Sequence, residues 1–136
     1  MSNMKNSSVD GKSLRFLKLT FDSAKVGYDT KEFKSVRAGI TKGITALGVS
    51  ERRGAIRTLM TVCDTVGVKA RVTQKADFVR IMTAASYWSY LSMAFAMTLT
   101  FDEPSRRSSW KEVEEISHMS MQDVAKISSF LDSIKT

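Results

Sequence analysis

The hydrophobic residues of this chain recur mainly at spacings of three and four, which is the period of amphipathic helices. One series runs through Val36, Ile40 and Ile44, and another through Val124 and Ile127. Small polar residues precede these series, as is common where helices begin. The pattern predicts helices within residues 29–48, 50–67, 73–100, 109–118 and 120–134.

Several of these predicted helices have recognisable start signals. A small polar residue followed three positions later by a carboxylate is typical of a capping box. The predicted caps are Asp29 with Glu32, Ser50 with Glu51 in the first turn, Thr73, Ser109 with Glu112, and Ser120 with Asp123.

The third predicted helix contains an uncharged run over residues 81–101, which is long enough to cross a bilayer. However, six Ser and Thr side chains lower its hydropathy. Tyr87, Trp88 and Tyr90 lie at its middle, whereas the aromatic belts of membrane helices lie at the interfaces. We therefore expect a central helix over about 74–100 that is buried on all sides, without integral membrane insertion.

The beginning of the chain has a different pattern. Residues 1–13 are polar and are expected to form a disordered tail with no secretory signal. Residues 14–21 partly alternate, which predicts a short strand or an extended arm. This segment could pack on its own core or on a neighbouring copy, and we favour the arm. The predicted self-association residues are Leu14, Phe16, Leu17, Leu19 and Phe21.

These elements together predict a mainly α protein. We expect a compact bundle of about five helices around the buried central helix, a flexible N-terminal arm and at most one or two short strands. The predicted organisation is a polar tail over 1–13 and a single helical domain over 14–136, which is long enough to bury a core.

Charge is unevenly distributed along the chain. Residues 1–80 contain 16 Lys and Arg against 7 Asp and Glu, a net charge of +9, whereas residues 81–136 contain 5 against 7, a net charge of −2. A basic half is suited to polyanions or to an acidic partner surface. The split also suggests that copies could dock basic side to acidic side.

The densest group of cations lies between residues 52 and 80. Residues 68–72 alternate, so they predict a short strand or an extended connector with Lys69 and Arg71 on one side. Cations at this density are suited to tracking a phosphate backbone, although most charged runs are simply solvated surface. The predicted nucleic-acid-binding residues are Arg52, Arg53, Arg57, Lys69, Arg71, Lys75 and Arg80.

The chain has few residues for catalysis or metal binding. His118 is the single histidine and Cys63 the single cysteine, so a zinc site with Cys and His ligands cannot be assembled. Cys63 lies on an apolar helical stripe and is expected to be a small buried residue. We therefore predict no catalytic residues, no metal and no cofactor, and we rank an enzyme with a carboxylate or lone-Cys mechanism third.

The sequence ALGVSERR over residues 46–53 resembles the turn of the helix-turn-helix in bacterial repressor domains. Val49 and Leu47 stand where that family has apolar residues. Ile44 replaces the usual Ala, and Gly54 and Arg57 replace apolar anchors of the recognition helix. A plain junction between two helices explains the segment better.

The combined prediction is a non-enzymatic, intracellular protein that binds nucleic acid through phosphates with little sequence specificity. RNA or another single strand is the expected partner, and self-association like that of a coat or nucleocapsid subunit is expected. The alternative is an interaction or regulatory protein whose basic face docks on an acidic protein or membrane surface. Localisation is expected to be cytoplasmic or nuclear rather than secreted.

Overall fold

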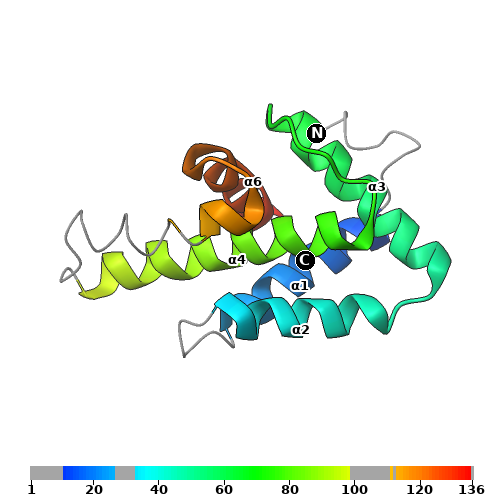
Figure 1. The fold of residues 1–136 in the computed structure, drawn as a ribbon, viewed down its shortest axis with the longest axis horizontal. Coiled ribbons are helices and arrows are strands. Elements are labelled where there is room, and N and C mark those ends of the chain that lie inside the picture. The colour runs from blue at the N-terminus through cyan, green and yellow to red at the C-terminus, as the bar shows by residue number, and fades with distance from the viewer. Residues whose placement is uncertain (1–10, 27–32, 99–110, 112, 136) are drawn as a thin grey trace.

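The computed structural model describes residues 11–26, 33–98, 111 and 113–135. These residues are mostly helical and include no strand. A short helical segment covers residues 113–117. The longer helices are α1 Gly11–Val26, α2 Phe33–Thr45, α3 Val49–Thr65, α4 Lys75–Thr98 and α6 Met121–Ser133 (Figure 1).

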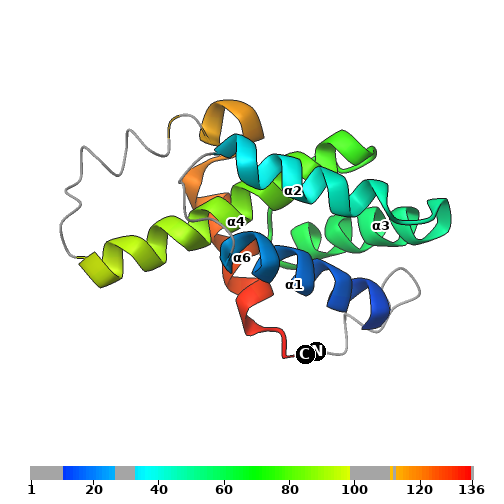
Figure 2. The ribbon, with the colours of Figure 1, turned by 90° about the horizontal axis from the view of Figure 1, so that it is seen from below.

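Helix α4 is the centre of the bundle. It lies between α2 and α6 and also packs on α1, and the view from below shows the same arrangement (Figure 2). Six consecutive residues, Ile81 to Ser86, are buried, which an amphipathic helix would not allow. The predicted helical bundle around a buried central helix is confirmed.

Three residues of α4 that carry hydroxyl groups, Thr83, Ser86 and Ser89, are buried inside the protein. Ser89 and Ser128 join α4 to α6 through a hydroxyl–hydroxyl hydrogen bond, and both side chains are buried. Within the described part of the chain, no helix is both long and apolar enough to cross a membrane.

The predicted strand or arm over residues 14–21 is wrong, because this segment lies inside α1. Leu17 and Phe21 are one helical turn apart and fully buried in the core of the same chain, while Leu14 and Phe16 are partly buried against it. Of the five predicted self-association residues, only Leu19 is exposed. The first helical residue, Gly11, also falls within the segment that was predicted to be a tail.

Polar contacts attach α1 to α6. The Nζ atom of Lys25 lies 3.0 Å from Oδ1 of Asp132, and Nζ of Lys18 lies 3.3 Å from Asp22 and 3.8 Å from Asp132. Both lysines also approach the ring face of Phe21. A cation held beside a buried aromatic ring contributes packing as well as charge.

The structure confirms one of the predicted helix caps and contradicts another. The Ser120 cap is confirmed, since its hydroxyl accepts a hydrogen bond from the Asp123 amide at 3.1 Å. The Ser50 cap is wrong: the cap of α3 is Gly48, two residues earlier, and the Gly48 amide donates to Glu51 at 2.9 Å. The caps predicted at Asp29 and at Ser109 lie outside the described residues.

The junction between α2 and α3 is not a helix-turn-helix unit. Helix α3 packs mainly on α1, whereas α2 packs mainly on α4. The two helices therefore do not form the paired unit in which the first helix supports a recognition helix.

Candidate nucleic-acid interface

The segment that joins α3 to α4 is an extended connector without strand pairing. Gly67 adopts a left-handed conformation with φ of 78°, and the Val68 amide then donates to the carbonyl of Cys63 at 2.8 Å. Val68 and Val72 are buried. Because side chains alternate in extended backbone, Lys69 and Arg71 point to solvent, as the sequence predicted.

Asp77 fixes the connector to the first turn of α4. Its Oδ2 accepts hydrogen bonds from the amides of Thr73 at 3.1 Å and Gln74 at 3.2 Å, and from the Thr73 hydroxyl at 3.2 Å. Burial alone would raise the pKa of Asp77, but these backbone hydrogen bonds, the hydrogen bond from Arg80 and the charge of Arg71 lower it instead. The carboxylate therefore stays charged, and its oxygens already accept hydrogen bonds from other groups of the protein.

Arg80 has a structural role that the sequence did not reveal. Its guanidinium donates to the carbonyl of Ser117, to the carbonyl of Arg71 at 3.2 Å and to Oδ1 of Asp77 at 3.4 Å. It joins the connector, α4 and the segment 113–117, and its side chain is only 17% exposed. Most of its N–H groups are therefore already used in hydrogen bonds within the protein.

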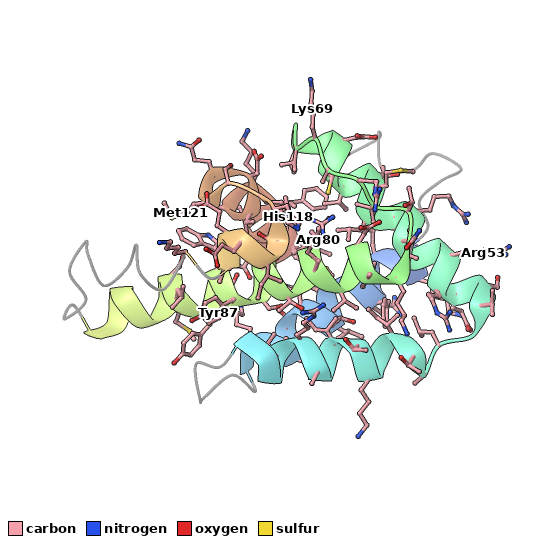
Figure 3. The ribbon with its side chains drawn as sticks, in the orientation of Figure 1. Arg53, Lys69, Arg80, Tyr87, His118 and Met121 are labelled. Atoms are coloured by element: carbon pink, nitrogen blue, oxygen red, sulfur yellow. The ribbon has the colours of Figure 1, made fainter. Side chains whose placement is uncertain are left out.

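A cavity of about 510 Å³ opens beside this network. Four cationic side chains and one carboxylate line it, together with His118, which directly follows the segment 113–117 and has a φ of 57°. Arg80 and His118 come from different segments and lie close together at the middle of the molecule (Figure 3). We call this the cationic cavity; its polar lining is Arg37, Lys69, Arg71, Asp77, Arg80 and His118.

Three of these residues, Arg37, Asp77 and His118, were not predicted. Arg37 is exposed on α2, next to the buried Val36, and the exposed His118 was considered only for catalysis or as a metal ligand. Neither belongs to the run of cations between residues 52 and 80. The local sequence contains no signal for them, because only the packing of α2 and segment 113–117 on α4 brings them to the connector.

The remaining predicted cations lie elsewhere. Arg53 and Arg57 are exposed near the start of α3, and Figure 3 shows Arg53 and Lys69 pointing away from the body in different directions. Arg57 lines a separate cavity with Lys12 and Glu51. The seven predicted cations therefore do not form one continuous track.

Arg52 and Lys75 lie outside the cationic cavity. Arg52 is partly buried, and its Nε has no hydrogen-bond partner among the described residues. The Nζ atom of Lys75 donates to the hydroxyl of Thr45 at 3.4 Å, which links the start of α4 to the end of α2.

The single cysteine is unsuited to nucleophilic chemistry. Cys63 is buried in the core, as predicted, and burial together with the nearby Asp64 raises the pKa of its thiol to about 12. A thiol with this pKa is almost entirely protonated at neutral pH. In the part of the chain that the structure covers, no three His, Cys, Asp or Glu side chains are grouped so that they could hold a metal ion.

Comparison with protein-family models, with curated proteins and with solved structures finds no match.

Proposed function

We propose that the protein binds nucleic acid, RNA or another single strand, by seating backbone phosphates at the cationic cavity. The observation that supports this is the convergence of four cations from three segments around one opening, with a single carboxylate among them. Asp77 carries one negative charge against these four cations and is paired with Arg80, so Arg37, Lys69 and Arg71 supply the excess positive charge.

Lys69 and Arg71 are the best candidates for direct phosphate contacts. Both are exposed, and the side chain of Arg71 is 74% exposed although its Nε lies 3.7 Å from Asp77. Their backbone is held by the buried Val68 and Val72, so little backbone freedom would be lost on binding. Arg37 extends the positive surface from α2.

The expected binding mode has little sequence preference. Phosphate contacts position a protein on a strand, whereas base-edge contacts specify the sequence. Affinity for unrelated single strands should therefore be similar and should fall steeply as salt rises, because each neutralised phosphate releases counterions. The proposal includes no catalytic step.

Fluorescence anisotropy with two unrelated single-stranded RNAs, at salt concentrations from about 50 to 200 mM, tests this proposal. The double variant Lys69→Ala/Arg71→Ala should lower the salt slope by about 1–2 units and weaken binding to both RNAs. The matched control is Arg53→Ala/Arg57→Ala, which removes the same charge near the start of α3. It should have a smaller effect.

Other results would lead to different conclusions. Equal losses in the two double variants would indicate attraction by net charge rather than by the cationic cavity. Wild-type binding by the Lys69→Ala/Arg71→Ala variant would exclude the site. No RNA binding at low salt, together with binding to vesicles that contain anionic lipid, would support the alternative of docking on an acidic surface.

Coat-like or nucleocapsid-like self-association stays a prediction within this proposal. The arm that was expected to mediate it is part of helix α1, so any contact between copies needs another surface.

A further inference from the structure

The cationic cavity concentrates positive charge at one point of the surface instead of extending it along a path. Its volume is about 510 Å³, and four cations and one carboxylate line it, which leaves an excess of three positive charges. Arg53 and Arg57 are exposed near the start of α3, outside this cavity, and Arg57 lines a different one. A cavity of this size is typical of sites that enclose a small ligand. The arrangement is therefore suited to one compact, strongly charged group.

Proteins that bind a single strand along its length usually have other features. They combine a positive groove that follows the backbone with exposed aromatic rings on which successive bases stack. Here, every Phe, Tyr and Trp side chain whose burial the structure describes is buried or partly buried. The described surface therefore provides neither a continuous track of cations nor an exposed platform for stacking.

The end of a strand differs in charge from its interior. An internal phosphodiester carries one negative charge. A phosphate monoester carries about −1.5 to −2 at neutral pH and has three strong acceptor oxygens. We propose that the cationic cavity binds a phosphate monoester at the end of an RNA or another single strand, an inference that rests on the proposed function and names the part of the strand that is recognised.

Arg37 and Arg71 are the best placed to hold this phosphate. They come from α2 and from the connector, both are exposed, and both line the cavity. A guanidinium offers paired N–H donors that match two oxygens of a phosphate. The 3.7 Å contact between Arg71 and Asp77 is made by Nε and does not use the Nη groups. Lys69 extends from the cavity into solvent (Figure 3), where its flexible side chain can reach the next phosphate of the strand.

The remaining lining is suited to the nucleoside that carries the phosphate. Ile116 is partly buried and Met119 is buried at the cavity wall, and the exposed His118 lies between them in sequence. Unstacked bases at strand ends commonly pack on rings such as imidazole. The cavity thus combines cations for the phosphate with an imidazole and apolar surface for the terminal base.

Fluorescence anisotropy with RNAs that share one sequence and differ only at their ends provides the test. One RNA carries a 5′-phosphate, one a 3′-phosphate, and one has hydroxyl groups at both ends, with the dye attached within the strand. A phosphorylated RNA should bind about tenfold more tightly than the hydroxyl-ended RNA, because charge-assisted hydrogen bonds are added. The end that gains affinity identifies the source of the monoester. A longer hydroxyl-ended RNA of the same total charge controls for general attraction and should gain less.

Variants determine whether this preference comes from the cavity. The measured quantity is the ratio of the affinities for the phosphorylated and the hydroxyl-ended RNA, because effects common to both RNAs cancel in it. Arg37→Ala and Arg71→Ala should each lower this ratio several-fold. Arg53→Ala is the matched control, since it removes the same charge from an exposed position outside the cavity and should leave the ratio unchanged. Circular dichroism checks that each variant is folded.

The outcomes separate end recognition from the proposed function. Equal binding of the RNAs that differ only at their ends would overturn the recognition of a terminal phosphate and leave the binding of backbone phosphates intact. So would a gain that the longer hydroxyl-ended RNA matches, or a preference retained in both Arg37→Ala and Arg71→Ala. The absence of binding to every RNA at low salt would contradict the proposed function itself, and end recognition with it.

Discussion

Arg80 and Asp77 form an ion pair at the start of α4, with 3.4 Å between Nη2 and Oδ1, while the other oxygen of Asp77 accepts the amides of Thr73 and Gln74. The carboxylate thus joins an ion pair to a helix start. Each partner limits the freedom of the other, and the connector that presents Lys69 and Arg71 depends on both.

Asp77→Asn should lower the free energy of unfolding by about 1–3 kcal/mol at neutral pH, because a buried, hydrogen-bonded charge is lost. The pKa of Asp77 is lowered by folding, so its contribution is fully present above the unfolded value of about 3.9 and is lost as pH falls through the folded value. The unfolding free energy of the variant should therefore fall less than that of the wild type between neutral and acid pH. Urea unfolding at several pH values measures this difference. Asp64→Asn, at an exposed position, is the control and should behave like the wild type.

Leu17→Ala should lower the free energy of unfolding by about 2–5 kcal/mol, because the side chain is fully buried and its removal leaves a cavity. The control on the same helix is Leu19→Ala, which should change stability by no more than about 0.5 kcal/mol under monomeric conditions. Deletion of residues 1–22 should unfold the protein, since it removes both Leu17 and Phe21. A folded truncated chain, observed by circular dichroism, would contradict the assignment of α1 to the core.

Cys63 should react with a thiol reagent only after unfolding. Burial raises the pKa of its thiol to about 12, so the protonated form stabilises the fold below the ordinary pKa near 9 and this stabilisation is lost between pH 9 and 12. The wild type should therefore lose more stability over that range than Cys63→Ala does. Labelling by iodoacetamide in native buffer, at the rate of a free thiol, would show that Cys63 is accessible.

Gly43→Ala should raise the stability of the monomer by about 0.5–1 kcal/mol, because the added methyl group enters open space and alanine favours the helix. The measurement is denaturant unfolding at a protein concentration below that of self-association. Gly67→Ala is a useful contrast, since φ of 78° at Gly67 is strained for alanine and should make that variant less stable. A loss of stability in Gly43→Ala would mean that something within one copy already occupies the space.

The sequence was sufficient to predict the helical class and the burial of the central helix. Val36, Ile40 and Ile44 are all buried at the predicted spacing, because periodicity reports which face of a helix meets the core. The sequence was less informative for residues 14–21. Leu17 and Phe21 have a helical spacing, whereas Leu14, Phe16 and Leu19 add an apparent alternation. The exposed Leu19 made this short segment ambiguous.

The cationic cavity could be predicted only in part. Lys69 and Arg71 follow from local alternation, since every second side chain of an extended segment points the same way. Arg37 and His118 depend on how distant helices pack, and Arg80 was assigned to binding although the fold uses its donors. Counting cations along a sequence does not reveal which of them have partners inside the protein.

The contact between Lys25 and Asp132 has a consequence for how quickly this protein can fold. The two residues are 107 positions apart, and the helices that contain them pack against each other and against α4. Helical proteins usually fold fast because most of their contacts are local. Here the contact between α1 and α6 forms only when the chain between them is closed into a large loop, and loop closure costs entropy. The folding rate should therefore be lower than that of an up-and-down bundle of similar size.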